Sequence, residues 1–254
     1  MNPYNEDQDK RINALYEKLH NSNLIFDNTI SLDDYFKIDK EELSNFSIYL
    51  KKIQKDIDWL KRNKHTKIYS AFIKQLESVE SFEIKIGDTE IYSKMRFSYV
   101  VTLMESCLCE MLKSVTMQYD EFRRNAINNI NDLKTLKVSA PILLDKNPKE
   151  ILDSAIMTHL SHILYHNIDK VTKVYSDVLG GAFPVIGNNI NKNVSELMAL
   201  RHDIVHRNGM KVNGEKIDVT PETVASCILD IRTFVFGVHN FIMQSVEKLK
   251  EKNV

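Results

Sequence analysis

Apolar residues recur at helical spacing in the first third of the chain. After Asp39, which can cap a helix, they repeat at alternating intervals of three and four, as in a coiled-coil seam. A second helical stripe follows a short polar link. We expect these two helices to pack on each other as a hairpin over residues 39–81, with an earlier helix over residues 11–20. The seam comprises Leu43, Phe46, Leu50, Ile53, Ile57 and Leu60, and the second stripe comprises Ile68, Phe72, Leu76 and Val79.

The rest of the chain shows the same spacing over longer stretches. We expect helices over residues 97–119, 121–137, 147–179 and 193–208, and a final long helix from Thr220. The first of these is so apolar that most of its surface must be buried. The last carries a seam with spacings of four and three, which is typical of a helix packed in a bundle.

Two short segments depart from helical spacing. Over residues 81–92 apolar and polar residues alternate around a Gly-Asp turn, which fits either a small β-hairpin or a loop. Residues 210–217 carry an Asn-Gly turn between short extended arms, which predicts a surface hairpin. We therefore predict an all-α fold with small β-hairpin insertions. It consists of an N-terminal helical segment at residues 1–94 and a helical bundle domain at residues 95–254.

Composition agrees with a helical protein. Only 7 glycines and 5 prolines occur in 254 residues, which leaves few breaks for a sandwich or barrel. Cys107, Cys109 and Cys227 are odd in number and lie within apolar helical patterns, so we expect reduced core thiols and no disulfide framework.

Charge and hydropathy narrow the functional classes. No apolar run approaches the roughly 18 residues of a membrane span, and the acidic, polar start of the chain is unlike a signal peptide. We expect a cytoplasmic protein that does not contact a membrane. The formal net charge of -1 predicts no broad basic surface, so any contact with nucleic acid must be local.

The densest group of chemically active side chains lies at the end of a predicted helix. Residues 201–209 read Arg-His-Asp-Ile-Val-His-Arg-Asn-Gly. Arg201 supplies an always-charged fork that suits a phosphate, and His206 is of the residue type that titrates near neutral pH. Cleavage of a phosphodiester requires both kinds of group.

This segment resembles the hallmark of the HEPN (higher eukaryotes and prokaryotes nucleotide-binding) domain, in which a histidine follows an arginine a few positions later. An apolar helix bearing Glu105, a short turn and a final long helix also fit that all-helical bundle, over about residues 95–248. The form of the motif looks most like bacterial defence and toxin members. The resemblance implies a metal-independent endoribonuclease without a cofactor, a homodimer that joins two motifs in one site, and an antitoxin or defence-system protein as a further partner.

The resemblance also implies roles for individual residues. Arg201 and His206 would be catalytic, and RNA would be cleaved to 2′,3′-cyclic phosphate and 5′-hydroxyl ends. Because residues five positions apart lie about 140° apart around a straight helix, a kink or a second subunit must bring them together. His202, Asp203 and Glu105 are expected to support them. The side chains expected to contact the RNA are Arg207, Asn208 and Lys211.

Each of these groups also has an ordinary structural interpretation. Arg201 would then pair with Asp203 or Glu196 on the surface. His206 would stabilise the C-terminal end of the helix, where a cation is favoured. Glu105 would be a paired or solvated residue at the edge of the core.

Two other functions remain open at this point. His159, His162 and His166 recur at spacings of three and four on one expected helix face, which suits a metal ion, although Asp169 is the only carboxylate at a matched position. The other alternative is a nucleotide-binding, RNA-binding or sensor module of the HEPN type without turnover.

Overall fold

A computed structural model describes residues 40–81, 89–187, 189–207 and 209–252 of the chain. The predicted helix over residues 11–20 lies outside the described residues, as does most of the predicted alternating segment. The described part is all-α and contains no β-strand, which confirms the predicted fold class. Its helices are α3 (Lys40–Arg62), α4 (His65–Ser81), α5 (Thr89–Gln118), α6 (Asp120–Asn129), α7 (Asn131–Lys134), α8 (Ala140–Asp145), α9 (Pro148–Ser161), α10 (Ile168–Leu179), α11 (Ile190–His206) and α12 (Pro221–Lys252).

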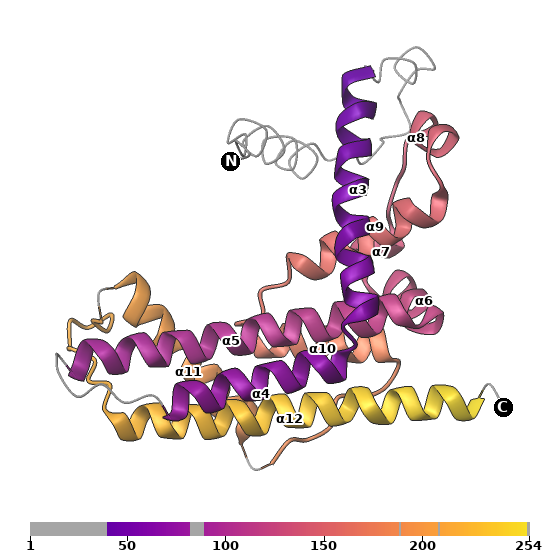
Figure 1. The fold of residues 1–254 in the computed structure, drawn as a ribbon. Helices are drawn as coiled ribbons and strands as arrows, with labels where there is room; N and C mark the ends of the chain where they lie inside the picture. The colour runs from indigo at the N-terminus through magenta and orange to yellow at the C-terminus, as the bar shows by residue number, and fades with distance from the viewer. Residues whose placement is uncertain (1–39, 82–88, 188, 208, 253–254) are drawn as a thin grey trace.

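Helix α5 lies at the centre of the bundle. It packs against α3, α4, α6, α9, α11 and α12, and α4 and α12 run alongside it (Figure 1). Most of its apolar side chains are completely buried, as the sequence predicted for such an apolar helix. These fully buried residues are Phe97, Val100, Val101, Met104, Leu108, Met111, Leu112 and Val115.

The prediction that the first two helices pack on each other as a hairpin over residues 39–81 is wrong, although both helices form. Helix α3 packs on α5 and α9 and leaves the bundle at a steep angle, whereas α4 packs on α5 and α12 (Figure 1). Polar groups of α5 hold the end of α3. Ser114 Oγ donates to the carbonyl oxygens of Leu60 and Asn63 at 3.3 and 3.1 Å, and Gln118 Nε2 donates to that of Leu60 at 3.3 Å. The carbonyls that a helix end leaves without intrahelical partners are therefore satisfied by α5.

The two predicted segments share one hydrophobic core. Helix α5 runs through the predicted boundary between residues 94 and 95. Leu60 of α3 and Leu76 of α4 belong to the same buried cluster as Ile231 of α12. Among the described residues, α3 and α4 are therefore part of the bundle.

The long helix predicted over residues 147–179 is divided into α9 and α10, which is a second correction. The start at Asn147 is as predicted, since its side chain accepts a hydrogen bond from the Lys149 amide at 2.9 Å. The break follows Ser161. Tyr165 Oη donates to the Leu160 carbonyl at 2.9 Å, and Asn167 Oδ1 accepts from the Lys170 amide at 3.0 Å to cap α10. Similarly, the helix predicted over residues 121–137 is divided into α6 and α7.

The segment between α11 and α12 is a short turn that follows the prediction in outline. Met210 and Lys216 form an isolated antiparallel bridge, and the Lys211 amide donates to the Glu215 carbonyl at 2.8 Å. Gly214 adopts a φ of +82°, a left-handed conformation that glycine accepts without strain. The segment therefore reverses like a hairpin without forming strands.

The three cysteines are free thiols, as predicted from their apolar surroundings. Cys107 and Cys227 are buried, and Cys109 is half-buried. Burial raises the pKa of each thiol, that of Cys227 to about 12. All three are therefore protonated near neutral pH and poor nucleophiles.

Helix α12 is the one described helix whose length and composition would allow a membrane span. Its most apolar stretch has a mean hydropathy of 1.2, and 44% of that stretch is buried inside the bundle. Ile228, Ile231 and Val235 are among its core residues. Packing against the other helices accounts for these apolar positions.

A buried imidazole, His65, and a half-buried one, His239, lie between α4 and α12. The rings of His65 and His239 are 5.9 Å apart, and the Tyr69 ring stacks on His239 at 4.1 Å. His65 Nε2 lies 3.5 Å from Met243 Sδ. Burial, assisted by His239 and nearby lysines, lowers the pKa of His65 to about 4, and burial also lowers the pKa of His239. Both rings are therefore neutral in the folded protein near pH 7.

We predict that His65 makes the protein less stable in mild acid. The pKa of His65 is lower in the folded than in the unfolded protein. The contribution of the neutral ring to the free energy of unfolding is therefore fully present above about pH 6.5 and is lost as the pH falls towards about 4. From the shift of the pKa, the loss is about 3 kcal/mol. His65→Leu should remove most of this pH dependence. Urea unfolding of both proteins from pH 7 to pH 4 measures it, and equal slopes would contradict the prediction.

Candidate functional site

The predicted motif occupies the last turns of α11, which is helical without a break to His206. The amides of Arg207 and Gly209 both donate to the Asp203 carbonyl at 3.1 Å, which ends the helix. Gly209 has a φ of +74°, so the chain reverses through a left-handed residue as the Asn-Gly sequence predicted. Asn208 lies outside the described residues.

The motif's two histidines lie on one exposed face of α11. The rings of His202 and His206 are 4.8 Å apart, as residues one helical turn apart can be. Both side chains are exposed. Of two neighbouring imidazoles, one can accept a proton and the other can donate one, as general acid–base catalysis requires.

Asp203 holds Arg207 and not Arg201. Its Oδ1 accepts a hydrogen bond from Arg207 Nη1 at 2.8 Å, an ion pair one turn apart. Glu196 pairs with Lys192 at 3.8 Å. The two carboxylates that the structural interpretation assigned to Arg201 are therefore each paired with another cation.

Arg201 has no ion-pair partner among the described residues. Its side chain is half-buried, and its Nε is fully buried without a hydrogen bond to any described residue. In the described part of the chain, no carboxylate oxygen lies within 4 Å of its guanidinium. A guanidinium whose charge no described carboxylate neutralises can receive an anion through its terminal nitrogens. The guanidinium therefore suits a phosphate.

Arg201 and His206 do not meet within one chain. Helix α11 has no kink between them, so they project about 140° apart around its axis. One of the two arrangements expected from the sequence is thereby removed, and a second subunit is left as the means of bringing these side chains together.

Glu105 lies against a different histidine from the one expected. Its Oε1 is 3.5 Å from Nδ1 of His166, in the segment between α9 and α10. Among the described residues no contact joins Glu105 to Arg201 or His206. Of the two interpretations, the structure therefore places Glu105 as a paired residue at the edge of the core.

The His166 segment and α11 enclose an open depression of about 370 Å³. It brings His166 from the break before α10 together with His202 of the motif. Sequence reasoning missed it because His166 was assigned to a continuous helix, although the capping residue Asn167 is a signal for the break. The depression is lined by His166, Asn167, Ile168, Asp169, Ser195, Met198, Ala199 and His202.

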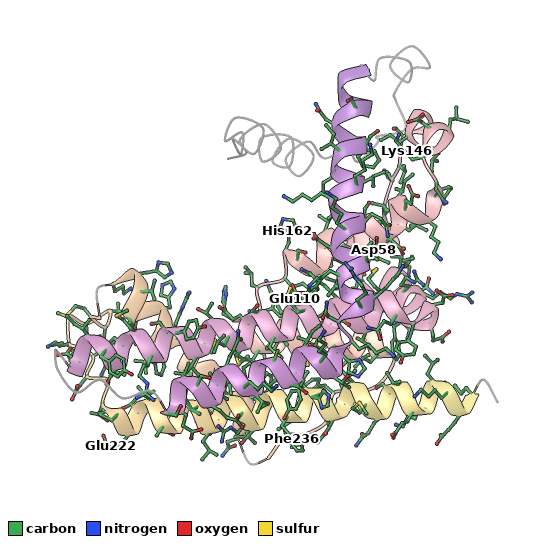
Figure 2. All side chains as sticks on the ribbon, viewed as in Figure 1. Asp58, Glu110, Lys146, His162, Glu222 and Phe236 are labelled. Atoms are coloured by element: carbon green, nitrogen blue, oxygen red, sulfur yellow. The ribbon has the colours of Figure 1, made fainter. Side chains whose placement is uncertain are left out.

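The predicted stripe of metal-binding histidines is wrong, because the break after α9 separates its members. His159 Nδ1 lies 3.4 Å from Asp132, and His166 pairs with Glu105. His162 caps the end of α9, where its Nδ1 lies 2.7 Å from the Thr158 carbonyl oxygen (Figure 2). No group of three metal-ligating side chains gathers within the described residues.

The cations beside the motif are largely paired. Lys211, an expected RNA contact, forms an exposed ion pair with Glu215 at 3.0 Å. Glu90 of α5 pairs with Lys216 at 2.7 Å and Lys94 at 2.6 Å. Hydrogen bonds from these two lysines lower the pKa of Glu90 to about 2, Lys216 having the larger effect. Sequence spacing offered no signal for Lys94, which packing brings to the end of α11.

No protein-family model, curated protein or solved structure matches this chain. Its function is therefore inferred from its own side chains.

We predict that the left-handed turn after the motif requires glycine. A Cβ on Gly209 would lie 2.8 Å from Lys94 Nζ, whereas a Cβ on Gly214 would meet nothing within 4 Å. Because both residues have positive φ, alanine at either should lower the free energy of unfolding by roughly 1–2 kcal/mol. Gly209→Ala should cost more, because Lys94 must also move. Urea unfolding compares the two variants, and a neutral Gly209→Ala would refute the requirement.

Proposed function

We propose that this protein is a metal-independent endoribonuclease of the HEPN type that acts on RNA in the cytoplasm. The observation that carries the proposal is an unpaired, half-buried guanidinium on the same helix end as two exposed imidazoles in contact. An all-helical bundle with the motif at the end of its penultimate long helix agrees with the resemblance seen in the sequence.

The residues can perform the reaction without a metal ion. His206 takes the proton of the ribose 2′-hydroxyl, and the 2′-oxygen attacks the adjacent phosphorus. The bond from phosphorus to the 5′-oxygen breaks, and that oxygen receives a proton from a second imidazole. Arg201 binds the phosphate and stabilises the charge that develops on its oxygens. The products carry 2′,3′-cyclic phosphate and 5′-hydroxyl ends, and DNA, which lacks the nucleophile, is not cleaved.

A homodimer supplies the geometry that one chain lacks. Since Arg201 and His206 diverge on α11, we infer that Arg201 of one copy acts with His206 of the other. Apolar side chains exposed near this end of the molecule suit such a contact, because burying them in a second copy is favourable. They include Val205 and Met210 beside the motif, and Ile91, Met95 and Tyr99 along α5.

The exposure of the motif on α11 suits the expected biology. An endoribonuclease that assembles on dimerisation can be kept silent by a protein that covers α11. The exposed motif would then be the contact of an antitoxin or defence-system partner. A chain held as a monomer would bind RNA through Arg201 and Arg207 without cleaving it, which is the alternative of a binding or sensor module.

We predict that the purified protein cleaves total RNA in the presence of EDTA. His206→Ala and Arg201→Ala should each reduce the rate at least about a hundredfold, as expected for loss of a general base or of the charge that stabilises the transition state. End-group analysis of the fragments should find cyclic phosphate and 5′-hydroxyl ends. His162→Ala, in an exposed helix cap away from the motif, is the matched control. Cleavage that survives in both motif variants would contradict the proposal.

We also predict complementation between the two inactive variants. If each Arg201 acts with the His206 of the other copy, a twofold dimer holds two such pairs, and mixing equal amounts of the Arg201→Ala and His206→Ala proteins should restore about a quarter of the wild-type rate. Half of the dimers would be mixed, and each of these would hold one intact site. Rate measurements after unfolding and refolding the mixture test this. Activity of wild-type protein without recovery in the mixture would mean that each chain carries its own complete site.

A further inference from the structure

The face of α3 that points away from the bundle carries a basic stripe with an exposed tryptophan. The stripe consists of residues at spacings of four, three, four and three, so it follows one side of the helix over about 20 Å. We call it the outer α3 stripe. Its members are Ile48, Lys52, Lys55, Trp59 and Arg62, all of them exposed.

The outer α3 stripe lies opposite the buried side of the same helix. Leu50, Ile57 and Leu60 face the bundle and are nearly inaccessible to solvent. The helix is thus held by its apolar seam and stands away from the other long helices, so its outer side is presented to solvent (Figures 1 and 2). The apolar seam is occupied by α5 and α9, and the outer side places Ile48 and Trp59 among three cations, which is not the continuous apolar face with which an amphipathic helix enters a membrane surface.

The charges of the stripe are available to an anionic partner. Lys52 and Lys55 lie within 4 Å of no carboxylate oxygen of a described residue. Arg62 uses its Nε for the Asp58 carbonyl at 3.1 Å, which leaves its terminal nitrogens free of any described partner. Asp56 and Asp58 lie at the two edges of the stripe, and Asp58 accepts a hydrogen bond from Gln54 at 2.8 Å. The centre of the stripe is therefore basic.

Trp59 gives the stripe a second kind of contact. It is 46% exposed, and it is the chain's only tryptophan. An exposed indole among unpaired cations is the combination that binds single-stranded nucleic acid, since the cations contact phosphates and the ring stacks on a base. A double-stranded helix hides its base faces, and an acidic protein segment offers the indole no base to stack on.

We propose that the outer α3 stripe binds single-stranded RNA. The stripe is separate from the motif on α11, so binding goes beyond the proposed cleavage and does not depend on it. For a ribonuclease the stripe would capture the substrate strand outside the site that cuts it.

The single tryptophan allows a direct test. The full-length protein is titrated with a 2′-O-methyl oligouridylate of about 16 nucleotides, which cannot be cleaved through its 2′-oxygen. We expect saturable quenching of Trp59 fluorescence that is reversed by salt. An unchanged spectrum would overturn the proposal, and so would equal quenching by polyglutamate, which would indicate an acidic protein as the partner.

Variants distinguish binding by the outer α3 stripe from general electrostatic attraction between the protein and the oligonucleotide. Anisotropy of the labelled oligonucleotide should show binding weakened at least about fivefold by Trp59→Ala and largely retained by Trp59→Phe. Lys52→Gln with Lys55→Gln should reduce the slope of log K against log salt by about 1.4. The matched control is Lys67→Gln with Lys74→Gln, which removes two exposed charges from α4. Equal weakening by the control pair would overturn the assignment to α3.

Binding and cleavage can fail independently. Loss of binding in the stripe variants with an inactive wild-type enzyme would support the stripe and refute the proposed ribonuclease. Unaltered binding in the stripe variants, together with active cleavage by the wild-type protein, would support the ribonuclease and refute the stripe.

Discussion

Burial of α5 is the constraint on which the rest of this structure depends. Most of the apolar surface of α5 is buried, because α3, α4, α6, α9, α11 and α12 all pack against it, although Ile91, Met95 and Tyr99 near its start are exposed. Its polar residues are used where neighbours meet it. Ser114 and Gln118 hold the end of α3, Glu105 faces His166, and Glu90 with Lys94 meets the turn after α11. The arrangement of α3, α4, α11 and α12 thus depends on how each of them covers α5.

The end of α11 combines two features that bear on chemistry. Its imidazoles are exposed and in contact, and its Arg201 is partly buried without a partner while the neighbouring carboxylates pair elsewhere. A cation without a neighbouring carboxylate can accept an anionic ligand, which is the basis of the proposed role of Arg201. The depression beside His202 extends from α11 towards the start of α10.

Two incorrect predictions share one cause. Periodicity identified the apolar stripes of α3 and α4 and the apolar positions of α9 and α10. It shows which side of a helix is buried, but it does not show which other helix buries that side. The α3 seam packs on α5 and α9 because α5 has more apolar surface than one neighbour can bury. The break between α9 and α10 is held by Tyr165 and Asn167, whose hydrogen bonds outweigh a hydrophobic spacing that continues through it.

The sequence by itself determined the contacts that span one helical turn. The pairing of His202 with His206, of Asp203 with Arg207, and the end of α11 at a glycine all follow from local spacing, since residues i and i+4 share a helix face. Only the tertiary structure decided contacts between distant segments, such as Glu105 with His166. It also left Arg201 unpaired and α3 projecting, because these depend on which surfaces compete to cover α5 and not on the spacing of any one segment.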